Sequence, residues 1–160
     1  MNQNKKFNAL LAFLFFIISP VVFSQTASQR VLTLAEAESM VKAAEQRAQQ
    51  DNWNVVISIV DAGGHLICLH KMDGTQVGSV EVSQKKAKAA VFYNRPTKVF
   101  QDQVSGGNNA IMLLPNVVAS EGGVPIQQDG RAIGAIGVSG VTSAQDGIIA
   151  NAAIEALKSN

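Results

Sequence analysis

Two short turns constrain the fold of this chain more than any other feature of its sequence. Asp129-Gly130 is a dipeptide favoured in two-residue hairpin turns, and Asp61-Ala62-Gly63-Gly64 is a second compact turn signal. Each turn lies between two runs of β-branched and other apolar residues. Because so short a connection joins only antiparallel strands, we expect two β-hairpins. The predicted strands are residues 54–60 and 65–71 in the first hairpin, and 124–128 and 131–138 in the second.

Helical patterns flank both hairpins. A capping box formed by Thr33 and Glu36 begins the first helix, which an apolar stripe extends to about Gln50. The region 101–123 shows little periodicity. The sequence therefore predicts an α+β fold, a single domain in which helices cover an antiparallel sheet, and not the βαβ order of nucleotide-binding sheets. The other predicted helices are residues 80–92, with Ser79 as N-cap, a short one from Pro96-Thr97, and one after Thr142 or Ser143.

The first residues have the pattern of a secretory signal peptide. Two lysines precede an apolar block at 9–18, and Pro20 interrupts the apolar sequence before it is long enough to span a membrane. Cleavage is predicted after Ser24, which divides the chain into a signal peptide, 1–24, and one domain, 25–160. We therefore expect a periplasmic or secreted protein that is not an integral membrane protein after signal cleavage.

The charged residues and the one cysteine restrict the classes of function. The chain holds 13 basic and 12 acidic side chains without a basic run, so nothing indicates nucleic-acid binding. The densest basic cluster, Lys85, Lys86 and Lys88, is expected to be a solvated helix face. Cys68 can form no disulfide within the chain, and its apolar neighbours favour a buried, inert thiol. Metal ligation or pairing with another chain are the alternatives for Cys68.

Both histidines of the chain, His65 and His70, lie in the second strand of the first predicted hairpin. Side chains five positions apart on a regular strand point to opposite faces, so that His70 would share a face with Leu66 and Cys68. The two imidazoles therefore cannot ligate one ion, and we reject a structural zinc site. His65 follows the double glycine at the solvent end of the turn, where one imidazole can supply an axial ligand to haem iron. The alternative is an ordinary imidazole that hydrogen-bonds near Asp61.

A second candidate region surrounds the C-terminal hairpin. Gly134, Gly137 and Gly140 do not have the spacing of a dinucleotide fingerprint, and glycine within a strand more often indicates close backbone approach. Gly140 does precede a predicted helix start, where backbone N–H groups can bind a carboxylate or phosphate. Glu121 is a candidate general base, but no acid or nucleophile stands at a recognisable spacing. We therefore expect binding rather than catalysis.

Six short motifs follow one another along the chain. They are Val60–Leu66, Met72-Asp73-Gly74, the lysine–alanine helix through Lys85 and Lys88, Arg95-Pro96-Thr97, Glu121–Pro125 and Ile136–Gly140. In this order they resemble the GlcG/HbpS-type haem-binding family, which is also found as the C-terminal domain of some PduO-type corrinoid adenosyltransferases. The resemblance covers about residues 31–158. It implies a profilin-like fold, frequent assembly into higher oligomers, and haem binding in some members, including exported ones.

The resemblance also bears on the choice of iron ligand. Some relatives look to use a histidine in the first helix, and this chain has no histidine there. His65 is then the natural candidate, with His70 second.

We therefore expect an exported, oligomeric haem-binding protein in which His65 is the axial ligand of the iron. Apolar side chains would hold the macrocycle, and a backbone group or Lys85 would meet a propionate. His70, Lys85 and Glu121 complete the set of candidate cofactor-binding residues. One alternative is an enzyme or sensor for a small organic acid or other anionic metabolite, bound by the Glu121 loop and the Gly140 helix start. Another is an interaction module whose Gly- and Ala-rich faces serve only assembly.

Overall fold

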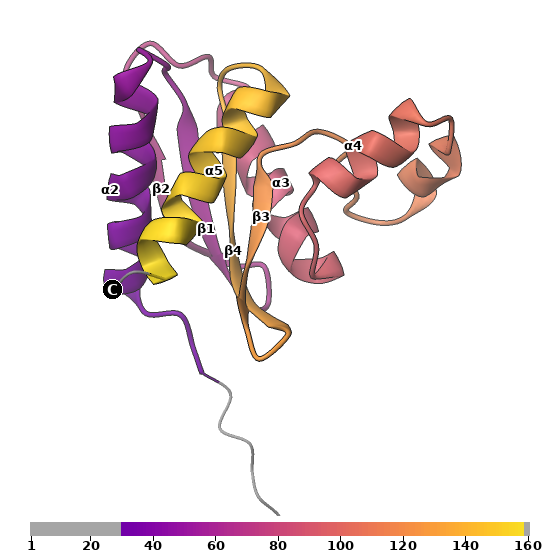
Figure 1. Cartoon of the computed structure of the whole chain (residues 1–160), viewed down its shortest axis with the longest axis horizontal. Helices are drawn as coiled ribbons and strands as arrows, with labels where there is room; N and C mark the ends of the chain where they lie inside the picture. The colour runs from indigo at the N-terminus through magenta and orange to yellow at the C-terminus, as the bar shows by residue number, and fades with distance from the viewer. Residues whose placement is uncertain (1–29, 159–160) are drawn as a thin grey trace, which may run out of the picture.

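The computed structural model describes residues 30–158, so the predicted signal peptide at 1–24 lies outside the described residues. Both predicted hairpins and all predicted helices are present, with ends that differ by a few residues (Figure 1). The elements in chain order are α2 (Leu34–Gln50), β1 (Val56–Asp61), β2 (Leu66–Lys71), α3 (Ser79–Tyr93), α4 (Lys98–Ser105), the 3-10 helix η2 (Asn109–Leu113), β3 (Gly123–Gln128), β4 (Arg131–Ser139) and α5 (Ser143–Lys158).

The four strands form one antiparallel sheet in the order β2-β1-β4-β3. Each hairpin supplies two neighbouring strands, and the first strand of one hairpin pairs with the second strand of the other. In that central pair Ile59 lies opposite Ile136. The predicted α+β class and the antiparallel sheet are therefore confirmed.

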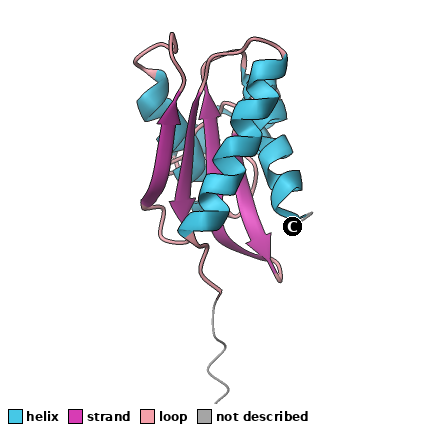
Figure 2. Cartoon of the chain, turned by 90° about the vertical axis from the view of Figure 1, so that its left-hand side faces the viewer, coloured by secondary structure: helices cyan, strands magenta, loops and turns pink. Residues whose placement is uncertain are grey.

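Helices cover both faces of the sheet (Figure 2). On one face α2 and α5 lie side by side and enclose the main core, which includes Ile57 and Ile136. On the other face α3 packs its alanines, among them Ala87, against Val60 and Ala135. A Cβ at Gly137 would collide with the backbone oxygen of Ser83 in α3. The glycines of β4 thus allow the close backbone approach that the sequence indicated.

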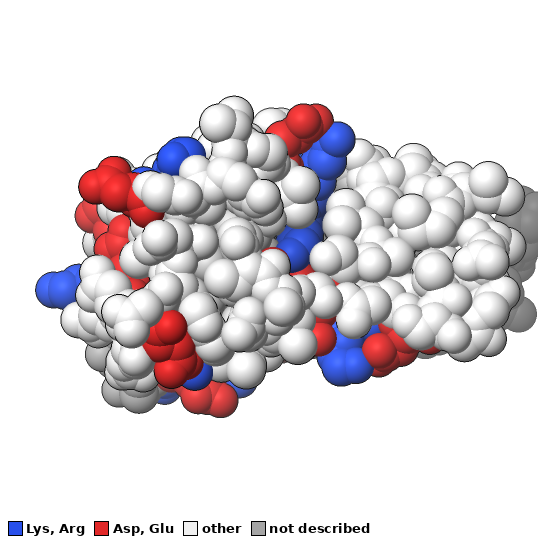
Figure 3. All heavy atoms as spheres, turned by 90° about the horizontal axis from the view of Figure 1, so that it is seen from above, with Lys and Arg blue, Asp and Glu red and all other residues white. Residues whose placement is uncertain are grey.

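The region predicted to be irregular, residues 101–123, contains the end of α4 and all of η2. Residues 98–120, which we name the arm, extend away from the sheet in Figure 1. Residues 103–120 contain no charged side chain, and the arm is a largely uncharged surface in Figure 3. Leu113, the last residue of η2 in the arm, is 86% exposed.

Among the described residues, no helix combines the length and apolar character needed to cross a membrane.

Candidate functional site

His65 lies at the solvent end of the first hairpin turn, as predicted. The Asp61 carboxylate shapes this turn, because its Oδ1 accepts hydrogen bonds from the backbone N–H groups of Gly63 at 2.8 Å and His65 at 2.9 Å. Partial burial would raise the pKa of Asp61, but these hydrogen bonds outweigh it and hold that pKa below its ordinary value. The turn is therefore anchored by an ionised carboxylate.

The imidazole of His65 is 84% exposed, and its Nδ1 lies 3.4 Å from Asp61 Oδ1. A carboxylate on that side favours the tautomer with the proton on Nδ1. In the described part of the chain no group hydrogen-bonds to Nε2 of His65. The second ring nitrogen is thus directed to solvent with its lone pair available.

His70 lies on the other face of the sheet from α3. Its Nδ1 is 2.9 Å from Glu45 Oε1 on α2. The register of the β1–β2 pair shifts at a β-bulge. Ile59 lies opposite Cys68, but the next residue, Val60, lies opposite Leu66. This bulge makes the predicted alternation wrong at one point: Leu66 faces α3, whereas Cys68 packs against the core under α2.

Cys68 is partly buried, and its surroundings bear on its reactivity. Burial raises the pKa of its thiol, with a smaller contribution from Glu38. This state fits the inert thiol expected from the sequence. Within residues 30–158 no three or more His, Cys, Asp or Glu side chains are arranged to hold a metal ion.

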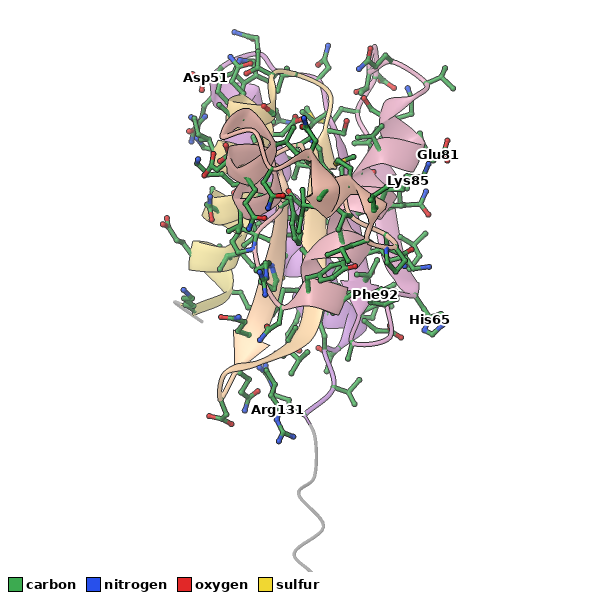
Figure 4. The ribbon with its side chains drawn as sticks, turned by 90° about the vertical axis from the view of Figure 1, so that its right-hand side faces the viewer. Asp51, His65, Glu81, Lys85, Phe92 and Arg131 are labelled. Carbon is green, nitrogen blue, oxygen red and sulfur yellow. The ribbon has the colours of Figure 1, made fainter. Side chains whose placement is uncertain are left out.

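Lys85 belongs to an exposed stripe along α3 that also contains Glu81, Lys88 and Phe92, at spacings of four, three and four residues. In Figure 4 the labelled members of this stripe lie on the same side of the molecule as His65. Lys85 Nζ lies 2.7 Å from Glu81 Oε1, and this hydrogen bond lowers the pKa of Glu81.

Two shallow hollows flank Lys85 and Lys88. The hairpin hollow, of about 270 Å³, separates α3 from the first hairpin. The arm hollow, of about 210 Å³, lies between the same two lysines and residues 116–118. Both combine apolar walls with the two ammonium groups, a composition suited to an amphipathic anion. Besides the two lysines, the hairpin hollow is lined by Val60, Gly64, Leu66, Glu81 and Gln84, and the arm hollow by Asn116, Val117 and Val118.

The structure brings only some of the predicted residues together. Gly64, the neighbour of His65, packs against α3 beside Lys88 and Phe92. The His65 ring itself lies over Gly63 and is not part of the hollow's lining.

Glu121 is remote from that turn. Its backbone N–H donates to Gln101 of α4 at 2.8 Å. A Cβ at Gly147 of α5 would collide with the Glu121 carboxylate. His70 and Glu121 thus do not share a site with His65.

Sequence reasoning missed a buried ion pair. Lys86 was expected on a solvated face, but it is 1% exposed and Asp146 is 2% exposed. Lys86 Nζ donates to Asp146 Oδ2 at 2.8 Å and to the backbone oxygen of Val138 at 3.1 Å. Burial raises the pKa of Asp146, against the lowering effect of the Lys86 ammonium. The burial of Lys86 could have been inferred from its helical position, because it lies on the same side of α3 as the small residues Ser83 and Ala87, which face the sheet.

The start of α5, proposed from the sequence as an anion site, is occupied by the chain's own side chains. The N–H of Thr142 donates to Gln145 Oε1 at 3.1 Å, and the N–H of Val141 donates to Asp146 Oδ1 at 3.2 Å. The backbone at Gly140 also hydrogen-bonds to Asp146. No observation at this helix start favours the organic-acid alternative.

Comparison with known proteins identifies the family. Residues 32–155 match the family described as haem degrading protein HbpS-like. This chain belongs to the HbpS-like family. It is 40% identical over 109 residues to protein GlcG of Escherichia coli K12, across 68% of this chain and 81% of GlcG. It is 34% identical over 138 residues to the corrinoid adenosyltransferase PduO of Salmonella typhimurium, covering 84% of this chain but only 41% of PduO.

Solved structures agree with this HbpS-like assignment. The crystal structure of Klebsiella pneumoniae protein ORFY matches with a TM-score of 0.76 at 33% identity, over 84% of this chain and 97% of ORFY. The crystal structure of the PduOC:heme complex matches with a TM-score of 0.73 at 35% identity, over 79% of this chain and 95% of PduOC. The resemblance read from the six motifs is confirmed.

Proposed function

We propose that this HbpS-like protein is an exported haem-binding protein that buffers, transports or senses haem, with His65 as the iron ligand. Membership of the family and the likeness to a PduOC:heme complex support haem as the ligand. The observation that carries the assignment to His65 is its exposed imidazole, with Nδ1 beside Asp61 and Nε2 open to solvent. One imidazole is a sufficient protein donor, because the porphyrin supplies four nitrogens.

The residues around the turn fit such a ligand. Val60 and Leu66 offer apolar contacts in the hairpin hollow, and lysines stand at its rim. Because the His65 ring is so exposed, it can turn from Gly63 toward the hollow without losing buried contacts. His70 is the weaker candidate, because ligation would break its 2.9 Å contact with Glu45.

A hemin titration of the mature protein tests this proposal. We expect a shifted Soret band that His65→Ala weakens and that the matched control His70→Ala leaves as in the wild type. An unshifted band in the wild type would refute haem binding. A loss confined to His70→Ala would transfer the ligand role to the other histidine.

Export and assembly are further parts of the proposal. The signal pattern in residues 1–24 supports export, and the mass of the protein recovered from the periplasm or medium checks cleavage after Ser24. Exposed apolar residues of η2 in the arm support self-assembly, since Met112 is 50% and Leu113 is 86% exposed.

A further inference from the structure

We propose that Lys88 and Phe92 bind the carboxylate and the ring face of a tetrapyrrole, and that Lys85 has no part in this contact. The inference rests on the proposed haem function and deepens it by assigning the residues that contact the periphery of the ligand. The ligand is a flat tetrapyrrole with free carboxylates, held through its periphery as well as through its metal.

The two exposed lysines of the stripe differ in whether a carboxylate already pairs with their ammonium group. Lys85 Nζ lies 2.7 Å from the Glu81 carboxylate, so an incoming anion must compete with an existing partner. Among the described residues no carboxylate pairs with Lys88, whose Nζ instead lies 5.3 Å from the centroid of the Phe92 ring. Lys88 also lines both hollows. Its ammonium is therefore the available positive charge on this face.

Phe92 supplies a flat apolar surface beside that charge. Its side chain is on the surface, with 46% of the residue exposed. The absence of a side chain at Gly64 lets the turn approach this ring, since a Cβ there would lie 2.7 Å from Phe92 Cε1 and 3.2 Å from Lys88 Cγ. Only a residue without a side chain lets the turn rest on both groups. Aromatic rings stack on one another in offset arrangements, and a tetrapyrrole offers a large face for this contact.

These groups lie next to the proposed iron ligand. Gly64 touches Lys88 and Phe92, and the next residue is His65. Lys88 and Phe92 are four residues apart on α3 and so occupy one helix face. Cation, aromatic ring and imidazole thus surround a single turn. Their charge and shape complement an anionic, planar ligand rather than a small polar acid.

The test compares hemin with metal-free protoporphyrin IX, which keeps the ring and both carboxylates but cannot be ligated by His65. We expect Lys88→Glu and Phe92→Ala each to weaken the binding of both ligands about tenfold or more, since a charge-assisted contact or an aromatic contact is lost. Lys88→Arg and Phe92→Tyr should bind nearly as the wild type does. His65→Ala should weaken hemin binding and leave protoporphyrin binding unchanged.

Two lysine variants serve as controls for charge. Lys85→Gln removes the neighbouring positive charge without placing a carboxylate beside Lys88, and Lys42→Glu adds a negative charge on exposed α2, on the opposite face of the sheet. We expect each to change affinity by less than about threefold, because Lys85 is already paired with Glu81 and because the distant charge at position 42 is screened. Circular dichroism checks that every variant is folded.

Three results would overturn the inference. If the wild type binds hemin while Lys88→Glu and Phe92→Ala bind both ligands normally, the contact assignment is wrong and the haem proposal stands. If Lys85→Gln or Lys42→Glu weakens binding as much as Lys88→Glu, the affinity depends on the overall charge of the protein and not on a contact of Lys88. If the wild type binds neither ligand, the proposed function itself fails.

Discussion

At the scale of single residues, the Asp61 carboxylate organises the candidate site. It accepts two backbone hydrogen bonds in the turn and lies beside the imidazole of His65. The pKa of Asp61 is below its ordinary value, so the folded state binds this proton less readily than the unfolded state. The stabilisation is complete above the ordinary value of 3.8 and is lost as the pH falls through the lower folded pKa.

The lowered pKa of Asp61 leads to a prediction for Asp61→Asn. At neutral pH the variant should be less stable than the wild type, because an amide accepts the same hydrogen bonds without the charge. The difference should shrink as the pH falls below 3.8. Urea unfolding midpoints between pH 7 and pH 3 measure this, with Asp73→Asn in the next turn as an exposed control. A constant difference across the range would contradict the role given to the charge.

The exposure and partners of a residue could be predicted from the sequence only where they depended on its neighbours along the chain. The exposure of His65 followed from its place after a double glycine. The partner of His70 did not, because Glu45 lies 25 positions away on α2. Lys86 was assigned to the solvated face of α3 because lysine clusters are usually exposed, and its acceptor Asp146 is 60 positions away in the sequence. Long-range partners of this kind leave no mark in a local pattern.

At the scale of elements, the Lys86–Asp146 pair joins α3 to α5, and its contact with Val138 adds β4. The pair is almost fully buried, with side-chain exposures of 2% and 3%. Removing one partner leaves the other charge in an apolar setting, which typically costs about 3–5 kcal/mol, whereas replacing both is often nearly neutral. The geometry therefore predicts strong coupling between the two positions.

We expect Asp146→Asn and Lys86→Met each to lower the free energy of unfolding by about 3–5 kcal/mol. The double variant Lys86→Met/Asp146→Asn should be closer to the wild type than either single variant, because its amide still accepts the Val141 N–H. A double-mutant cycle from urea unfolding gives the coupling. Additive single effects would show that the two side chains act independently.

Elements whose signals are local were predicted well. Thr33 and Glu36 form the capping box of α2, with the Glu36 N–H donating to Thr33 Oγ1 at 3.2 Å. The bulge in the first hairpin was not predicted, because it depends on the packing of β2 against both helix layers. The 3-10 helix η2 of the arm was also not predicted, since the sequence of region 101–123 has no helical period.

At the scale of the whole molecule, two hairpins and their flanking helices were enough to predict the fold class. They were not enough to predict the strand order, because the contact between β1 and β4 brings together residues far apart in sequence. The hydrophobic periodicity of the sequence likewise gave no indication of the projecting arm. The apolar residues that the arm exposes, Met112 and Leu113, contribute little to packing within the chain, so a role for them requires contact with another molecule.

The arm therefore carries the last prediction, which concerns assembly. Leu113 is 86% exposed within residues 103–120, a segment without charged side chains, and a glutamate there would place an unpaired carboxylate in any apolar interface. Such burial costs several kcal/mol, so Leu113→Glu should reduce the native mass to smaller species at about micromolar concentration. Leu34→Glu on α2, where the leucine is 55% exposed, is the matched control and should keep the wild-type mass. Native mass spectrometry decides between them, because equal masses for the wild type and Leu113→Glu would exclude the arm as the assembly surface.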